Sequence, residues 1–255
     1  MSTITPDSAP GGSAAAASML TPAEAAAAFV ARYRWIILIG LITAAVMEVL
    51  DTTIINVALP QMAGNLGATE EEIGWVATGY ILSNVIFLPM TAFFTERFGR
   101  QRYLTFSIFL FIAASFFCGT SNSLTELVFW RIVQGAGGAA LLSTAQATLR
   151  QIFPLEQQGI VQAVFLLGII VAPTVGPTLG GWITDNFSWR WVFLLNVPVG
   201  MLLSLLAARV IADPPEQVAA RKARLAGGLR VDYIGFALLV IGMCALQVVL
   251  DKGQE

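Results

Sequence analysis

Long apolar runs separated by short polar stretches make up most of the chain after residue 34. Each run is long enough to cross a membrane, because about 20 predominantly apolar residues span the hydrocarbon core of a bilayer. Backbone groups in lipid must be satisfied within the segment, so each run predicts a helix. The seven runs lie at 35–59, 73–95, 103–120, 124–149, 158–184, 191–211 and 232–250. The pattern therefore predicts an all-α membrane protein.

Composition supports this fold class and narrows the chemistry. Hydrophobic residues make up 56% of the chain and charged residues 12%, whereas soluble domains carry about a quarter charged residues. The net charge of −2 argues against a nucleic-acid partner. Both cysteines fall in apolar runs, where a thiol acts as a small hydrophobe. The chain has no histidine, so proton handling near neutral pH falls to carboxylates.

The basic residues predict the orientation, since cytoplasmic loops are enriched in Lys and Arg. An N-terminus inside leaves only Arg190 and Lys252 outside, with Arg131 in the membrane. Eleven basic residues then lie on the cytoplasmic side: Arg32, Arg34, Arg97, Arg100, Arg102, Arg150, Arg209, Arg221, Lys222, Arg224 and Arg230.

The structural roles of the stretches outside the runs are predicted from their composition and their position along the chain. Residues 1–31 are rich in Ala, Ser, Pro and Gly and predict a disordered cytoplasmic tail. No basic region precedes their alanine tract, as a signal peptide would require. Residues 32–211 would form one bundle, 212–231 a cytoplasmic linker, 232–250 a seventh span and 251–255 a truncated outer loop.

Three charged residues inside the runs are the first candidates for function. A charge at the bilayer centre costs roughly 2.5–3.5 kcal/mol on insertion scales, so such residues normally face a protein interior or an aqueous cavity. Glu48 and Asp51 lie in the first run and Arg131 in the fourth. At about 1.5 Å per residue, Asp51 and Arg131 lie roughly 13 and 10 Å below the outer boundary. Their shared depth predicts a contact, either as a functional site or as a pair that serves stability alone.

A short internal repeat relates the turns after the second and fifth runs. Residues 92–99 and 181–188 share the order small, apolar, apolar, Thr, acid, polar, Phe, small. Runs one to three and four to six then look like two copies of a three-helix unit. Because three is odd, the copies are inserted in opposite orientations, a signature of secondary transporters. A chance match of these positions is the alternative.

The fifth run carries a stripe of small residues with two prolines beside it. Small residues every four positions line one helix face and let another backbone come close. Each proline removes an intrahelical donor and favours a bend. The pattern fits simple helix packing and also a hinge or seal between two halves. Its residues are Gly168, Ala172, Pro173, Gly176, Pro177, Gly180 and Gly181.

The basic turn after the second run serves either as a topology anchor or as a latch whose acid exchanges partners with nearby helix ends. Its candidate residues are Glu96, Arg97, Gly99, Arg100 and Arg102. The three acids at 70–72 have a simpler interpretation, a solvated first turn of a helix.

Taken together in order, these residues resemble the major facilitator superfamily, and within it the fourteen-span drug/proton antiporters of the EmrB/QacA type. The chain departs from the usual signature loop, with Ala92 in place of glycine and Glu96 in place of aspartate. It also stops just after the first extra helix, and so resembles the N-terminal half of such a transporter. The matching segments are 50–60, 92–102, 131–135, 172–181, 189–200 and 246–253.

The resemblance implies a six-helix N-terminal bundle of a 3+3 inverted repeat plus one additional helix, in the bacterial inner membrane. It implies proton-coupled efflux of amphipathic drugs or other lipophilic or cationic compounds by alternating access, with antibiotic resistance as a consequence. The proton gradient supplies the energy, and no cofactor, metal or enzymatic reaction is implied. Asp51, Glu48, Arg131 and Gln134 would couple proton and substrate. The C-terminal half would supply the partner of the small-residue stripe, and a periplasmic membrane-fusion adaptor is compatible with the family.

Three alternatives stay open at this point. The chain is a non-transporting truncated or regulatory seven-span protein, or it belongs to an exporter of one specific metabolite. A receptor or light-driven protein fits less well, because the basic loops place the N-terminus inside. A retinal Schiff base would also need a membrane lysine, and Lys222 and Lys252 lie outside the runs.

Overall fold

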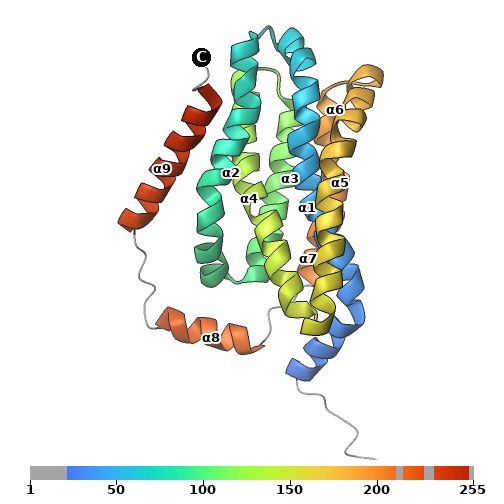
Figure 1. Ribbon diagram of the computed structural model, residues 1–255, viewed down its shortest axis with the longest axis vertical. Coiled ribbons are helices and arrows are strands. Elements are labelled where there is room, and N and C mark those ends of the chain that lie inside the picture. The colour runs from blue at the N-terminus through green and yellow to red at the C-terminus, as the bar shows by residue number, and fades with distance from the viewer. Residues whose placement is uncertain (1–21, 211–214, 227–232, 253–255) are drawn as a thin grey trace, which may run out of the picture.

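The computed structural model describes residues 22–210, 215–226 and 233–252, and the regular structure there is helical (Figure 1). The long helices stand side by side in a bundle, α8 lies across one end of it, and α9 stands beside α2. The helices are α1 (Pro22–Leu66), α2 (Glu70–Phe98), α3 (Arg100–Thr120), α4 (Leu124–Ile152), α5 (Leu155–Asn186), α6 (Arg190–Leu194), α7 (Asn196–Val210), α8 (Pro215–Ala226) and α9 (Tyr233–Lys252). The predicted all-α fold is confirmed.

Most of the predicted runs correspond to long apolar helices, but the fourth and the seventh run differ from the others. By length and composition, five helices of the described ranges can cross a membrane: α2, α3, α5, Arg32–Leu66 of α1 and Arg190–Arg209. α4 is equally long but lies outside this set because small and polar residues lower its hydropathy. α9 contains a shorter apolar helix, Ile234–Gln247.

The predicted disordered tail is wrong over residues 22–31, because α1 begins at Pro22. The alanines of this stretch have a high helix propensity, so they extend the long helix that follows them. Residues 1–21 and 253–255, which were also assigned to the tail and the outer loop, lie outside the described ranges. The stretch assigned to a linker contains α8, whose apolar Val218 and Leu225 share one face of an otherwise charged helix.

Local chemistry explains where the helices begin and break. Thr69 accepts a hydrogen bond from the Glu72 backbone N–H while the Glu72 carboxylate accepts from the Thr69 backbone, a capping box that confirms the predicted acidic first turn. Gly99 alone joins α2 to α3, at a φ of 92° that favours glycine. The sixth run divides into α6 and α7 because Pro198 has no N–H for the Leu194 carbonyl.

The pairing of helices follows the predicted three-helix repeat. α1 packs along α5, and α4 packs along α2. If the first and second predicted helices are exchanged with the fourth and fifth, the α1–α5 pair becomes the α4–α2 pair. α4 also packs closely against α3, which places it at the centre of the bundle.

Glycines on α4 allow this close packing. A Cβ at Gly137 would lie 2.8 Å from the Phe111 backbone nitrogen and 2.9 Å from the Ser107 carbonyl oxygen of α3. A Cβ at Gly135 would collide with the Tyr80 carbonyl oxygen of α2. The backbones of α2, α3 and α4 therefore approach within distances that exclude larger side chains.

The small-residue stripe of α5 packs inside this bundle, against α1. A Cβ at Gly180 would lie 3.1 Å from the Ile54 carbonyl oxygen, and one at Gly176 would collide with Thr53. Gly168 faces Ile42 in the same way, so the expectation that the stripe meets the second half of the protein is wrong. Ala172 is buried on this face, Gly181 only touches Val57, and α5 continues through both prolines.

Replacement of Gly137 by Ala is expected to lower the thermal unfolding temperature in detergent. The new methyl group overpacks a backbone contact, which typically costs about 1–3 kcal/mol. Gly74→Ala is the matched control, because a Cβ there meets nothing within 4 Å and alanine favours helix. Equal unfolding temperatures for the two variants would contradict the close α3–α4 packing.

Candidate functional site

Asp51 lies on the buried face of α1, and both of its carboxylate oxygens accept hydrogen bonds. Oδ2 accepts from Arg131 Nη1 at 2.6 Å. Oδ1 accepts from Gln134 Nε2 at 3.0 Å and from Asn196 Nδ2 at 2.8 Å. Asp51 and Arg131 are each 1% exposed. The contact predicted from their shared depth is therefore present, as a buried ion pair.

Arg131 is held on several sides. Nη1 also donates to Gln134 Oε1 at 2.7 Å, three residues along the same face of α4. Nε donates to the Val76 carbonyl oxygen of α2 at 3.0 Å. The guanidinium carbon lies 4.2 Å from the centroid of the Tyr80 ring, within range of a cation–π contact. These contacts fix the position and direction of the guanidinium group.

Ser115 and Asn196 complete the network from α3 and α7. Ser115 Oγ accepts from Gln134 Nε2 and from Asn196 Nδ2, both at 3.1 Å, and donates to the Phe193 carbonyl at 3.1 Å. Asp51, Ser115, Arg131, Gln134 and Asn196 thus form one hydrogen-bonded network that joins α1, α3, α4 and α7. Neither Ser115 nor Asn196 was predicted from the sequence as part of the site. Their only signal is that a polar side chain interrupts an apolar run.

Glu48 lies one turn before Asp51 on α1, in contrasting surroundings. Its Oε1 accepts from Asn84 Nδ2 at 3.2 Å. Its Oε2 is buried and has no hydrogen-bond partner among the described residues. The same holds for Tyr80 Oη and Ser83 Oγ of α2. A Cβ at Gly138 of α4 would collide with Tyr80 Oη, so the absence of a side chain at Gly138 provides the space that the Tyr80 hydroxyl group occupies.

The five residues of the predicted latch lie together in sequence but have different environments. Glu96 Oε1 pairs with Arg224 Nη1 of α8 at 2.8 Å, a partner that the sequence analysis did not anticipate. Arg100 is 6% exposed, whereas Arg97 and Arg102 are exposed. The Glu96 pair is itself accessible to water, and such pairs contribute about 0–1 kcal/mol.

The sequence matches the family model described as Major Facilitator Superfamily over residues 41–250. The chain belongs to the major facilitator superfamily. This superfamily member is 38% identical over 220 residues to the multidrug export protein EmrB of Escherichia coli, covering 86% of this chain and 41% of EmrB. It is 36% identical over 211 residues to the fatty acid resistance protein FarB of Neisseria gonorrhoeae, covering 82% of this chain and 40% of FarB.

Solved structures confirm the superfamily fold. The proton:xylose symporter XylE bound to 6-bromo-6-deoxy-D-glucose superimposes with a TM-score of 0.66 at 16% identity, over 87% of this chain and 54% of XylE. A bacterial homologue of the human lysosomal transporter Spinster gives a TM-score of 0.62 at 17% identity, over 72% of this chain and 44% of the homologue. The chain thus spans about two fifths of the length of the curated relatives.

In this superfamily member, Arg131→Met is expected to destabilise the bundle by about 3–5 kcal/mol, because it leaves the Asp51 carboxylate buried without its countercharge. The double variant Asp51→Leu/Arg131→Met is expected to recover part of that loss, since no unpaired charge then remains. Unfolding in detergent, monitored by circular dichroism, measures the stability of both variants. A double variant at least as unstable as the sum of the two single variants would argue against a charge-paired core.

Proposed function

We propose that the complete protein is a proton-coupled exporter of amphipathic, lipophilic or cationic compounds by alternating access, and that this chain forms its N-terminal bundle. The observation that carries the proposal is the pair of carboxylates on one face of α1, both buried inside the bundle. Intramembrane acids of this kind normally serve ion or substrate pathways. The similarity to multidrug export proteins supports the substrate class.

The two carboxylates have different parts in this mechanism. Asp51 is already saturated with donors, so it fixes α1 against Arg131, Gln134 and Asn196. Glu48 keeps one oxygen without a hydrogen-bond partner and has the neutral amide of Asn84 beside the other. Glu48 is therefore the group that exchanges a proton for the cationic part of a substrate. Because the network converges on the Asp51 carboxylate, loss of that carboxylate would loosen α1 from α4 and α7.

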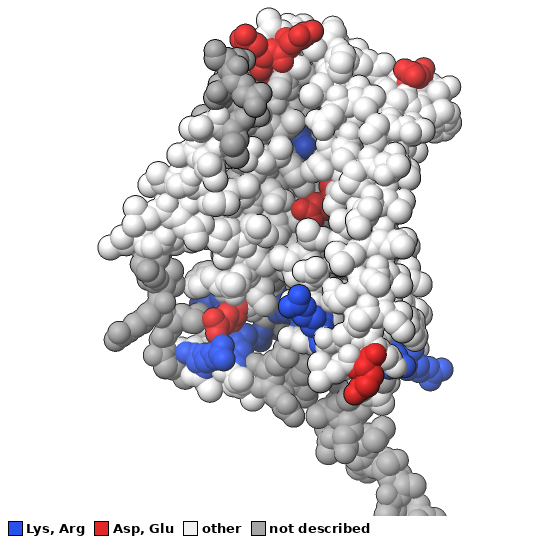
Figure 2. All heavy atoms as spheres, viewed as in Figure 1, with Lys and Arg blue, Asp and Glu red and all other residues white. Residues whose placement is uncertain are grey.

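We infer the orientation from the distribution of charge. On the face that Figure 2 shows, Lys and Arg side chains gather at the end that α8 crosses, with acidic side chains among them, while the charged side chains at the opposite end are acidic. Under the positive-inside rule we infer that the α8 end is cytoplasmic, with the N-terminus on that side. The bacterial relatives support a bacterial inner membrane as the location. A periplasmic adaptor would then meet the acidic end.

The basic turn and the α5 stripe are assigned to the conformational change. Glu96 holds an exposed, exchangeable ion pair with Arg224, as a latch between alternating states requires. The stripe of α5 lets α1 and α5 slide against each other without side chains that interlock. A small movement of α1 near Glu48 would in this way be transmitted to α5.

Glu48→Gln and Asp51→Asn are both expected to abolish proton-driven efflux in the complete protein, and to differ in stability. Glu48→Gln removes a titratable charge whose loss leaves no partner unpaired. Asp51→Asn replaces an acceptor oxygen with a donor in front of other donors, which costs about 1–3 kcal/mol. Efflux of a lipophilic cation from energised vesicles and thermal unfolding measure the two effects. Wild-type efflux in either variant would remove that carboxylate from the coupling site.

The chain as given is expected to insert and pack, but to leave drug accumulation unchanged. Alternating access is largely the movement of one bundle against another around a central site, and one bundle has no second wall. Cells that lack their own drug pumps would express residues 1–255, and accumulation of a fluorescent lipophilic cation would be followed. Lower accumulation that a protonophore reverses would show that this bundle transports alone.

A further inference from the structure

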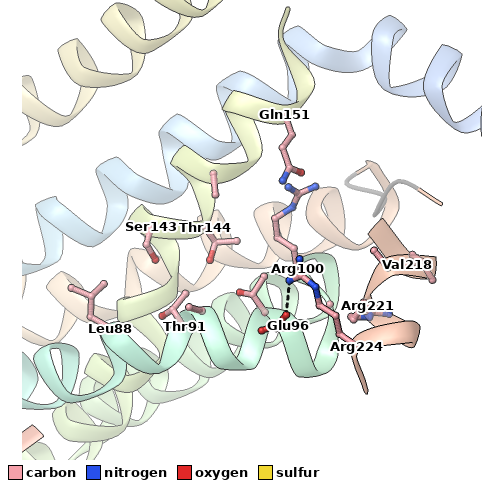
Figure 3. A pocket seen from close by; sticks show the side chains of 15 residues that line it. Leu88, Thr91, Glu96, Arg100, Ser143, Thr144, Gln151, Val218, Arg221 and Arg224 are labelled. Atoms are coloured by element: carbon pink, nitrogen blue, oxygen red, sulfur yellow. Dashed lines mark hydrogen bonds and ion pairs between the residues drawn. The ribbon is translucent and has the colours of Figure 1, made fainter. Parts of the chain in front are cut away.

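A pocket of about 670 Å³ opens between α2, α4 and α8 at the basic end of the bundle (Figure 3). It lies at the other end of α4 from Arg131 and involves neither intramembrane carboxylate. α8 closes one side of it, and hydroxyl-bearing side chains of α2 and α4 form another. Its polar lining is Thr91, Thr95, Glu96, Arg100, Ser143, Thr144, Gln151, Arg221 and Arg224.

Positive charge predominates in this pocket. Arg100, Arg221 and Arg224 lie toward one side of it in Figure 3, against a single acid, Glu96. That acid already pairs with Arg224 at 2.8 Å. Arginine presents a planar fork of donors that matches phosphate and carboxylate oxygens. The charge balance favours an anionic occupant.

The hydroxyl groups distinguish the pocket from a merely basic surface. Thr91 donates to the Phe87 carbonyl of its own helix, and Ser143 donates to the Ala139 carbonyl. Thr144 is 3% exposed, and its Oγ1 has no hydrogen-bond partner among the described residues. Figure 3 shows its side chain directed into the pocket. A buried hydroxyl without a partner is costly and is normally satisfied, so its orientation indicates a bound group.

We propose that this pocket binds a phosphate group, with α8 as the element that closes over it. Three arginines supply the charge and Thr144 a neutral donor, the combination that phosphate oxygens require. Two sources share this chemistry: a free phosphate and the headgroup of an anionic lipid. The apolar part of the lining, with Leu88 and Val218, and the location at a basic boundary favour the lipid. The proposal does not depend on the export activity.

The test uses the purified chain in a neutral detergent, with native mass spectrometry and thermal unfolding as readouts. Phosphatidylglycerol, phosphatidylcholine and inorganic phosphate are added separately. The test variants are Arg221→Gln/Arg224→Gln and Thr144→Val. Lys222→Gln is the control for charge on α8, because it removes one positive charge at an exposed position that does not line the pocket.

The chain is expected to retain phosphatidylglycerol over phosphatidylcholine and to unfold at a higher temperature with it. The double arginine variant is expected to weaken retention about tenfold or more, as loss of two charge-assisted contacts would. Thr144→Val is expected to weaken it several-fold, and Lys222→Gln to leave it unchanged. Stabilisation by inorganic phosphate, lost in the same variants, would assign the pocket to a free phosphate. Retention that is unaffected by the arginine and threonine variants, or reduced equally by Lys222→Gln, would overturn the proposal.

Discussion

The buried ion pair between Asp51 and Arg131 is the constraint on which the rest of this bundle depends. Neither charge has access to water, so each must be matched by protein groups, and a buried pair stabilises only when its remaining hydrogen bonds are also satisfied. Gln134, Asn196 and Ser115 meet that requirement from three different helices. The positions of α3, α4 and α7 around α1 are therefore fixed by polar geometry as well as by packing. Apolar contacts alone would allow these helices to rotate or slide.

The close approach of the backbones makes this polar centre possible. Short side chains such as those of Asp51 and Ser115 reach their shared partners, Gln134 and Asn196, only if their helices lie unusually near. Gly135 and Gly137 provide that approach for α2, α3 and α4, and the α5 stripe provides it for α1. In lipid, where apolar side chains gain little by leaving the solvent, such packing and interhelical hydrogen bonds drive association.

The sequence predicts those features that depend on distance along a helix. Depth below the membrane boundary follows from residue number, so the Asp51–Arg131 contact could be predicted. Rotation about a helix axis does not follow from it, which is why Ser115 and Asn196 were not identified. The α5 stripe indicates close approach without naming a partner, and its partner proved to be α1. α8 was assigned to a linker because its charges conceal an apolar face. The partner of Glu96 depends on that helix and could not be foreseen.

The central claim is that one carboxylate of the site fixes the helices while the other exchanges its proton for substrate. Proton release on substrate binding tests it directly. The complete protein would be mixed with a lipophilic cation in weakly buffered detergent, and the change in pH would be recorded for the wild type, Glu48→Gln and Asp51→Asn. The account predicts proton release by the wild type and by folded Asp51→Asn, and none by Glu48→Gln. Release of wild-type size by Glu48→Gln, with none by Asp51→Asn, would contradict it.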